Sequence, residues 1–395
     1  MEFEKHCWAE IDLDALRHNF ALIKDTVGGP VCAVVKADAY GHGDVVVAST
    51  LQQAGAAAFA VSCLAEACHL RRHGITRPIL ILGYTDPAFA ARLAKNEITQ
   101  AVFSTAYATA LSAAATAAGV TVSCHLKVDT GMGRIGFAVR GGAAAFETAV
   151  QGLESAYALP GLCVTGIFQH FAVADSNHAD NIAYTEEQHD LFTRIVTRLQ
   201  ADGFATGTVH CANSAAQMRH PEWRGNLTRA GIILYGLDPS DEVHFAGLRP
   251  VMTLKTVVAH VKTLAAGQSV SYGRTFQASA PLQVATVCVG YADGYPRQLS
   301  GTQGQGLMLA AGHPAPVLGR VCMDQTLLDV SSVPGLAMGD EVIVFGPGGA
   351  DTADSIARKT GTINYEITCG ISRRVPRVYL ENGAPTTLWN DLEEN

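Results

Sequence analysis

The chain has 395 residues, of which 48% are hydrophobic and 16% charged, with 39 glycines and a formal net charge of -8. This composition excludes an intrinsically disordered chain, and the length suits two domains better than one small core. Lysine and arginine form no clustered run, so a nucleic-acid-binding surface is not expected.

The ten cysteines predict a reduced, cytoplasmic protein. No Cys-x-x-Cys pair occurs, and the first residues contain no basic start leading into an apolar run, so a secretory signal is not expected. Most cysteines stand singly in apolar segments, where we interpret them as small buried hydrophobic residues: Cys32, Cys124, Cys163, Cys211 and Cys288.

Two uncharged stretches, 45–65 and 98–124, have the length of membrane spans. Both are rich in Ala, Ser, Thr, Gln and Gly, with few Leu or Ile. Each divides naturally into a helix and a strand, around Gly55 in the first stretch and Gly119 in the second. We therefore expect no membrane segment.

The first predicted elements are a short strand and a barrel. Cys7–Asp12 alternates like an edge strand and could pair with either domain. Between residues 13 and 243, eight apolar runs alternate with Ala-rich amphipathic segments, which predicts a (β/α)8 barrel, with a doubly wound parallel sheet as the alternative. The predicted strands are Val31–Val35, Ala57–Cys63, Pro78–Leu82, Gln100–Phe103, Val120–Val128, Leu162–Phe168, Thr208–Cys211 and Gly231–Tyr235.

The pattern changes after the barrel. From residue 244 to 395, short alternating runs are separated by Gly/Pro-rich turns, and long amphipathic segments are scarce. This pattern predicts a second, mostly β domain, with His244–Pro250 as the connection between the two domains.

Lys36 ends the first apolar run and is followed by small residues, Tyr40, Gly41 and Gly43. A lysine at the end of a buried strand costs free energy unless it is paired or used chemically. Because desolvation lowers the pKa of its amine, Lys36 is a candidate for Schiff-base formation. The glycines predict a sharp turn that lets the backbone approach a ligand.

Further polar groups follow the ends of other predicted strands, where the active sites of barrels lie. Each also has a purely structural explanation: the arginines as ion-pair partners, the histidine as a core residue, and Ser214 as the cap of a helix starting at Ala215. No metal site is expected, because no His, Cys, Asp or Glu set has ligand spacing. The groups are Lys127, Arg134, His170, Ser214, Arg229, Gly231 and Ile232.

The predicted β domain carries two turn motifs, Val270–Arg274 with Tyr272 and Gly319–Gln325 with Met323. Taken alone, both are ordinary turns, and Tyr365 is an ordinary surface or core aromatic residue.

In chain order, the Ala33–Gly43 motif, the Lys127–Gly136 segment, the Ser271–Gly273 turn and Arg320–Gln325 resemble the alanine racemase family of fold-type III pyridoxal-phosphate enzymes. The resemblance covers nearly the whole chain. It implies a barrel followed by a β domain, to which the N-terminal strand belongs, and a homodimer in which residues 244–395 contribute to the partner's active site. The implied reaction interconverts L-alanine and D-alanine on pyridoxal 5'-phosphate.

The resemblance also implies a role for each matching residue. Lys36 holds the cofactor as an internal aldimine and shares proton transfer with Tyr272 of the partner subunit. Arg134 and Met323 contact the substrate, and Lys127 matches a lysine that is carbamylated in many members. The implied cofactor contacts are Lys36, Tyr40, His170, Ser214, Arg229, Gly231, Ile232 and Tyr365.

Two acid/base groups are needed because one fixed base cannot reach both faces of a planar carbon. A tyrosine, with its ordinary pKa near ~10, is a poor base at neutral pH. The Arg134 cation, and His170 if it is protonated, would lower the pKa of the tyrosine.

Three alternatives remain open. A serine or broad-specificity small amino-acid racemase shares these motifs; unusual residues such as Arg274 could alter substrate entry, whereas Tyr365 narrows the space for a hydroxymethyl group. A fold-type III decarboxylase is disfavoured, because a glycine-rich phosphate loop and a late Cys-Asp-Gly motif are missing. A non-enzymatic pyridoxal-phosphate carrier would be a single barrel without residues 244–395.

Overall fold

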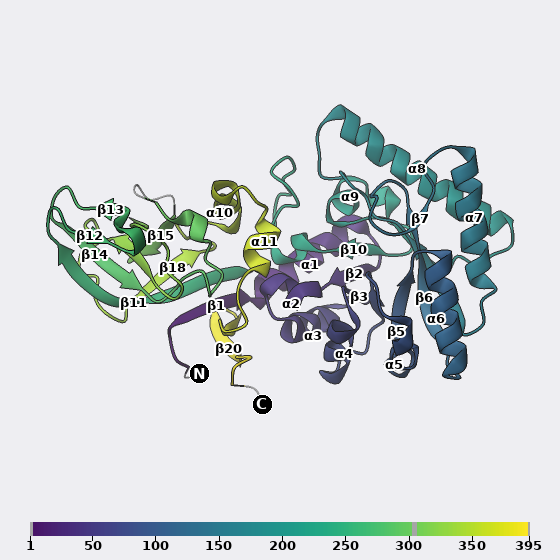
Figure 1. Ribbon diagram of the computed structural model, residues 1–395, viewed down its shortest axis with the longest axis horizontal. Coiled ribbons are helices and arrows are strands. Elements are labelled where there is room, and N and C mark those ends of the chain that lie inside the picture. Colours follow the sequence, from purple (N-terminus) through teal and green to yellow (C-terminus); the bar gives the residue numbers. More distant parts are fainter. Residues whose placement is uncertain (1–2, 302–305, 394–395) are drawn as a thin grey trace.

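The computed structural model describes residues 3–301 and 306–393, so the extreme ends of the predicted terminal segments lie outside the described residues. A parallel, eight-stranded sheet curls into a nearly closed barrel in the strand order β10-β2-β3-β4-β5-β6-β8-β9 (Figure 1). Between its two ends, the Arg229 N–H donates to the carbonyl of Ala212 at 3.0 Å. The strands are β2 (Val31–Val34), β3 (Ala58–Val61), β4 (Ile79–Ile81), β5 (Ile98–Val102), β6 (Val122–Asp129), β8 (Leu162–Phe168), β9 (Thr208–His210) and β10 (Thr228–Ala230).

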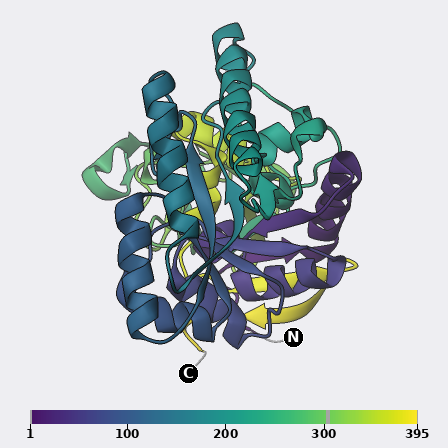
Figure 2. The ribbon, with the colours of Figure 1, turned by 90° about the vertical axis from the view of Figure 1, so that its right-hand side faces the viewer.

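Helices surround this barrel, as the view rotated by 90° shows (Figure 2). The first helix illustrates why they form: the Asp12 carboxylate accepts the N–H groups of Asp14 and Ala15, and Phe20 and Ile23 are buried on the inner face. The helices are α1 (Leu13–Val27), α3 (Asp44–Ala54), α4 (Leu64–Arg72), α5 (Ala90–Lys95), α6 (Thr105–Ala117), α7 (Ala143–Tyr157), α8 (Ala179–Ala201) and α9 (Ser214–Arg219).

The second sheet is mostly antiparallel and extends away from the barrel (Figure 1). Its central strand β11 (Met252–Leu264) pairs with three others: β1 (Cys7–Asp12), β14 (Leu282–Val287) and β18 (Glu341–Phe345). On its other side, β1 pairs with β19 (Arg377–Glu381). The remaining elements of this region are β12 (Ser269–Val270), β13 (Phe276–Gln277), β15 (Leu307–Ala310), β16 (His313–Pro316), β17 (Thr326–Asp329), α10 (Ala353–Thr360), α11 (Asn364–Cys369) and β20 (Ala384–Trp389).

The predicted fold class, a (β/α)8 barrel followed by a mostly β region, is confirmed. The eighth strand was misplaced, however: β10 ends at Ala230, and Ile232–Tyr235 forms a 3-10 helix, η3. Ile232–Tyr235 is completely buried, and a short buried helix and a buried strand give the same apolar run.

The N-terminal segment is not an edge strand. Cys7–Asp12 lies inside the second sheet, antiparallel to β11 on one side and parallel to β19 on the other. Ala9 and Ile11 are fully buried there. The alternating pattern therefore indicates that one face of the strand is buried, but it does not indicate whether the strand has a neighbour on one edge or on both.

All ten cysteines are free, and Cys163 is exposed, contrary to the prediction that it is buried. Within residues 3–301 and 306–393, no helix combines the length and the apolar character that crossing a membrane requires.

Candidate active site

Lys36 begins an unusual turn directly after β2. The next element, α2 (Lys36–Gly41), contains four successive residues, Ala37 to Tyr40, whose φ angles lie between 51° and 56°. This is left-handed backbone, which costs non-glycine residues roughly 1–2 kcal/mol each. Gly41 and Gly43 also have positive φ angles, as a sharp turn at the glycines requires, but the turn begins four residues earlier. The strain at those four residues must be offset by contacts from elsewhere in the fold.

Two charged side chains that the sequence analysis missed hold this turn. The Glu66 carboxylate on α4 accepts the N–H groups of Ala37, at 2.8 Å, and Ser62, at 2.7 Å. Arg377 on β19 donates to the Gly41 carbonyl through Nε, at 3.1 Å, and Nη2, at 3.0 Å. Arg377 stands at the edge of an apolar run, as Lys36 does. A charged residue in such a position was the signal that identified Lys36, and it could have identified Arg377.

The environment of Lys36 favours a reactive amine. Burial lowers its pKa, and the guanidinium of Arg134 lowers it further. Arg134 itself is exposed, on the loop that follows β6. Its charge also lowers the pKa of Lys127 and of His170, which places these four side chains in one electrostatic neighbourhood.

Lys127 lies inside the barrel on β6 and is 3% exposed. Burial lowers its pKa to about 8, with smaller contributions from the cations Arg134 and Arg229. Its Nζ lies 5.6 Å from the centre of the Phe168 ring. A substantial part of this amine is therefore neutral, and nucleophilic, near pH 7–8.

Three polar groups from distant segments converge beside this turn. The Ser214 hydroxyl accepts the N–H of Gly231 at 2.9 Å. A Cβ added to Gly231 would lie 2.8 Å from the Tyr40 hydroxyl and 3.4 Å from the Ser214 hydroxyl. Only glycine leaves this space open, so the three groups form a cradle lined with potential hydrogen-bond donors.

Neighbouring residues complete the cradle. Ile232 follows Gly231 at the start of η3 and is fully buried. The Tyr365 ring on α11 lies 5.9 Å from the Tyr40 ring. The alternative explanation of Ser214 as a helix cap is wrong, because the Asn213 side chain accepts the Ala216 N–H at 3.0 Å instead. The Ser214 hydroxyl is thereby left to face the cradle.

Arg229 is buried on β10 and anchored by several acceptors. It donates to the Gln169 carbonyl at 2.8 Å, to the Cys211 carbonyl at 3.1 Å and to Nδ1 of His210 at 2.8 Å. Burial lowers its pKa to about 10, so it remains a cation at neutral pH. Because arginine only donates, His210 must carry its proton on Nε2, which in turn donates to Nδ1 of His125 at 2.9 Å.

The surroundings of His170 decide the protonation state that the sequence leaves open. Its Nδ1 lies 3.4 Å from Nη2 of Arg229, so it faces a donor. Burial lowers its pKa well below the ordinary value, and the cations Arg229, Arg134, Lys127 and Lys36 lower it further. His170 is therefore neutral at physiological pH.

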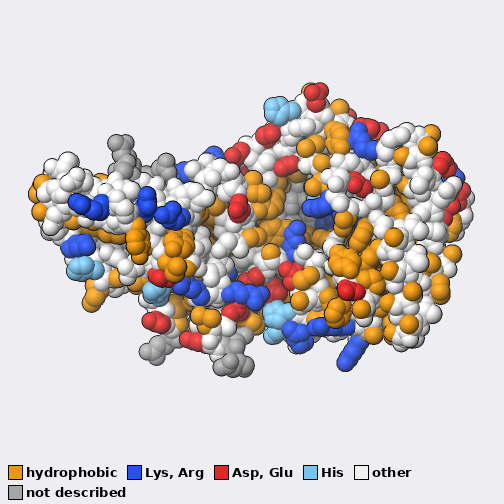
Figure 3. All heavy atoms as spheres, viewed as in Figure 1, with side chains coloured by type: hydrophobic (Ala, Val, Ile, Leu, Met, Phe, Trp, Pro, Cys, Tyr) orange, Lys and Arg blue, Asp and Glu red, His pale blue; other side chains and the backbone are white. Residues whose placement is uncertain are grey.

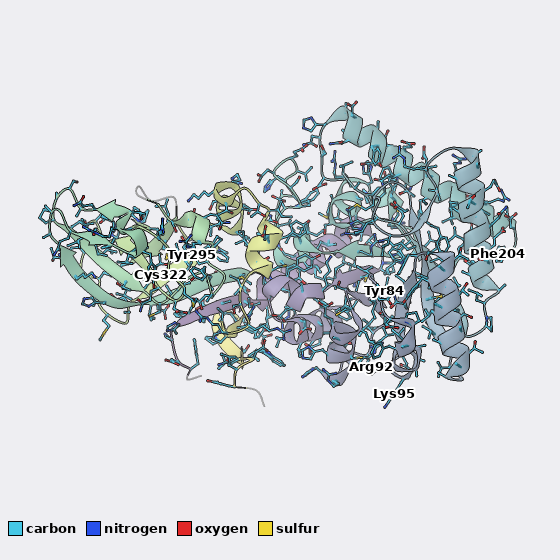
Figure 4. All side chains as sticks on the ribbon, in the orientation of Figure 1. Tyr84, Arg92, Lys95, Phe204, Tyr295 and Cys322 are labelled. Atoms are coloured by element: carbon cyan, nitrogen blue, oxygen red, sulfur yellow. The ribbon has the colours of Figure 1, made fainter. Side chains whose placement is uncertain are left out.

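Tyr272 and Met323 lie apart from these residues. They are 69% and 52% exposed, and together with Cys322 and Asp324 they line an open hollow in the second sheet's region. Figure 1 shows the flanking strands β12 and β13 at the end farthest from the barrel, and Figure 4 shows Cys322 there as well. One chain therefore does not bring Tyr272 to Lys36.

The space-filling view shows the surface of the molecule on the face that Figure 1 presents. A hollow near the middle of the face contains Lys and Arg side chains set among hydrophobic ones (Figure 3). A positively charged, partly apolar depression suits a small anionic ligand with an apolar body.

Comparison with known proteins gives a consistent result. The model for "Alanine racemase, N-terminal domain" matches residues 11–239, and that for "Alanine racemase, C-terminal domain" matches residues 251–379. An alanine racemase of Desulfovibrio desulfuricans is 49% identical, with 96% of this chain and 100% of the relative covered. One of Desulfosudis oleivorans is 47% identical, with coverages of 96% and 98%.

Solved structures agree with these relatives. An alanine racemase of Clostridium difficile superposes with a TM-score of 0.91 at 40% identity, covering 98% of this chain and 99% of that one. The alanine racemase of Bacillus anthracis with bound L-Ala-P has a TM-score of 0.89 at 36% identity, with 99% of both chains covered.

Proposed function

The chain belongs to the alanine racemase family, and we propose that it interconverts L-alanine and D-alanine with pyridoxal 5'-phosphate as its cofactor. One observation carries this assignment: Lys36, whose pKa is lowered, lies at a turn that leads directly into the cradle of Tyr40, Ser214 and Gly231. When bound, the cofactor supplies an aldehyde that an amine can join and a ring that withdraws electrons from the substrate's α-carbon.

The residues present fit this group. Lys36 Nζ would hold the aldehyde carbon, and the cradle that a Cβ at Gly231 would fill suits the phosphate. The phosphate contacts in this proposal are Tyr40, Ser214, Tyr365 and the N–H groups of Gly231 and Ile232. Arg229 would face the ring nitrogen, and because it stays protonated it would donate to that nitrogen rather than accept a proton from it.

Two groups move the α-proton in this proposal. Lys36 accepts or returns it at Nζ on one face of the substrate, which its lowered pKa favours at neutral pH. Tyr272 of the partner subunit acts at its hydroxyl on the opposite face. Because His170 is neutral, the positive charge that attracts the phenolate comes from Arg134. Arg134 and Met323 also orient the substrate.

The exposure of Tyr272 and Met323 supports a homodimer with shared active sites. In one chain both side chains line an open hollow remote from Lys36, so the site is complete only when a second copy covers the barrel mouth. We propose that residues 13–243 bind the cofactor, that residues 244–395 complete the partner's site, and that residues 1–12 belong with the latter region.

Lys127 supports a further element of the proposal. Its amine, with a pKa of about 8, can add to carbon dioxide, which forms an N–C bond and releases one proton to solvent. The resulting carbamate is an anion that would accept hydrogen bonds from Arg134. Mass spectrometry of the intact protein under native conditions should show the added carbon dioxide, and Lys127→Arg should not acquire it.

Borohydride reduction tests the assignment. The holoenzyme should be yellow, and reduction should bleach its visible band and leave the cofactor covalently on the peptide that contains Lys36, with the Lys127 peptide as the internal control. In a parallel assay, alanine should racemise faster than serine. A colourless protein that takes up no added pyridoxal phosphate, or label on a different lysine, would contradict the proposal. Carbon dioxide release from the amino acid would indicate a decarboxylase instead.

A further inference from the structure

The loop that carries Met323, residues 322–325, is held from behind by a second loop, residues 290–294. We call them the Met323 loop and the Asp293 loop. The Met323 carbonyl accepts the N–H of Ala292 at 3.0 Å. A Cβ added to Gly290 would lie 2.3 Å from the same carbonyl, so the close contact depends on glycine. The Asp293 loop therefore supports the backbone at Met323 directly.

A third segment, residues 370–375, packs against the Asp293 loop in the same manner. The Ser372 N–H donates to the Asp293 carbonyl at 3.1 Å. A Cβ added to Gly294, whose φ angle is 106°, would lie 2.4 Å from the Gly370 carbonyl. The three segments are therefore stacked in a row, with the Asp293 loop between residues 370–375 and the Met323 loop.

The Arg374 side chain crosses this stack. Its Nε donates to the Asp293 carboxylate and its Nη2 to the Asp324 carboxylate, both at 2.8 Å. Asp293 is 1% exposed, and its other carboxylate oxygen accepts the Gly290 N–H at 2.8 Å. Because a guanidinium holds its acceptors in fixed directions, Arg374 fixes the Met323 loop against the Asp293 loop.

The Met323 loop also contacts the turn that carries Tyr272. The Ser271 hydroxyl donates to the Arg320 carbonyl and lies 3.5 Å from Sγ of Cys322. A shift of the Met323 loop would therefore change the surroundings of Tyr272 as well.

We propose that Arg374 is a positioning residue for the active site of the partner subunit. The inference rests on the proposed function, in which Tyr272 and Met323 of one chain complete the site of the other. Arg374 contacts neither substrate nor cofactor in this proposal. It holds Asp324, the chain neighbour of Met323, and the loop behind it, so its effect is exerted across the interface.

Residues 370–375 also contact the cradle of their own chain, which gives the opposite direction of action a physical basis. Arg377 donates to the Ile371 carbonyl and to the Gly41 carbonyl, each at 3.0 Å. Figure 4 shows Cys322, in the Met323 loop, on the side of α11 that faces away from the barrel. Both carboxylates that Arg374 binds belong to the two loops on that side, which favours an effect on the partner's site.

Hybrid dimers made from two differently tagged chains separate the two directions. Lys36→Ala in one chain leaves one working site, which combines the barrel of the intact chain with Tyr272 and Met323 of the Lys36→Ala chain. This parental hybrid should retain about half of the wild-type activity. Arg374→Gln in the Lys36→Ala chain should lower kcat/KM for alanine by about tenfold or more, because small misplacements of orienting groups are costly. Arg374→Gln in the intact chain should leave kcat/KM unchanged.

Two further variants separate positioning from folding. Arg374→Lys keeps a cation beside the buried Asp293 but lacks the fork that spans two carboxylates, so it should show the same dependence on placement with a smaller loss. Arg373→Gln, at the exposed neighbouring arginine, is the matched control and should have no effect in either chain. Hydrogen exchange, measured by mass spectrometry on the Arg374→Gln homodimer, should become faster in residues 290–294 and 322–325.

The placement of the change decides the outcome. Equal losses from both placements would show a merely structural role, and a loss confined to the intact chain would show that Arg374 acts on its own cradle. Either result would overturn the proposal, as would no loss from either placement or unchanged hydrogen exchange. An inactive parental hybrid would contradict the shared sites of the proposed function, and this inference with them.

Discussion

The two regions that carry the candidate catalytic groups differ in how much of their surroundings one chain provides. Around Lys36, Tyr40 and Ser214 are each 7% exposed and Arg229 is 3% exposed. Around Tyr272, the side chains project into an open hollow. The difference teaches that the groups proposed to hold the cofactor are preorganised within one chain, whereas the groups proposed to complete the site are displayed for a partner.

Both regions nevertheless use strained backbone. Ser271 and Arg274, which flank Tyr272 and Gly273, have positive φ angles of 63° and 50°. Ala37 to Tyr40, next to Lys36, have positive φ angles as well. The turn at Tyr272 is held by the Ser271 hydroxyl, which donates to the Arg320 carbonyl, and by the Arg274 N–H, which donates to the Ser271 carbonyl at 3.2 Å. Exposure of Tyr272 thus does not mean that its loop is unstructured.

The largest expected effect comes from Tyr272→Phe. Loss of one of two opposed acid/base groups should reduce racemisation by roughly 10²–10⁴-fold. Exchange of the α-hydrogen with solvent should persist for one enantiomer of α-deuterated alanine, because Lys36 still serves its own face. Tyr291→Phe, a partly exposed tyrosine of the same region, is the control and should remain active. Equal retention of exchange for both enantiomers would count against two opposed groups.

A mixture of two inactive variants sharpens the comparison between the regions. In a dimer of Lys36→Ala with Tyr272→Phe, one site contains both changes and the other contains neither. Random exchange of subunits makes half of the dimers mixed, so about a quarter of the wild-type activity should return. The control is each variant exchanged with itself, which should stay inactive. No recovery despite demonstrated subunit exchange would show that Tyr272 does not act across an interface.

Arg377→Leu should weaken the preorganised region itself. The guanidinium donates to the carbonyls of Gly41, Ile371, Ser372 and Val375. All four bonds would be lost, although the Ser372 carbonyl would keep the N–H of Val375. We expect a loss of about 3 kcal/mol in the free energy of unfolding, measured in urea, together with weaker cofactor binding. Arg373→Leu, whose side chain is exposed, should change stability by no more than about 0.5 kcal/mol. Equal effects of the two changes would refute the anchoring role of Arg377.

The smallest effect is a dependence of stability on pH that separates the two regions. His125 has a pKa of about 4 in the folded barrel, below the ordinary value near ~6.5 that it regains on unfolding. Between these values the unfolded chain binds a proton that the folded chain does not, so stability falls as pH drops from about 6.5 towards 4. Each such histidine contributes about 1.4 kcal/mol per pH unit.

Urea unfolding at pH 7.5, 6.5 and 5.5 measures this slope. His125→Gln should make the slope shallower, whereas His313→Gln, at an exposed position of the second region, should leave it unchanged. An identical slope in all three proteins would show that His125 is not kept neutral in the folded protein.

Much of the fold was accessible from the sequence because burial and periodicity are local signals. Seven of the eight barrel strands fall within or overlap the predicted runs, and Lys36 was identified from its place at the end of one of them. The eighth strand was predicted at the wrong position because Ile232–Tyr235 is buried on all sides, and a buried strand and a buried short helix have the same hydrophobic pattern. The roles assigned to the individual site residues stay predictions.

The charge of His170 could not be decided from the sequence, for a different reason. Its sequence neighbours give no sign of the four cations that lower its pKa, because these come from β6, β10, the turn after β2 and the loop after β6. Glu66 and Arg377 were missed for the same reason, since both act on a turn that is distant in sequence.

The sequence by itself determined the family, the order of barrel and β region, and the side chains with which the chemistry can be done, because hydropathy patterns and motifs are written along the chain. Only the tertiary structure decided that a left-handed turn follows Lys36, that His170 is neutral and that Tyr272 stands apart on the surface. Strain, pKa values and exposure depend on groups brought together through space, and no local pattern encodes which distant groups those are.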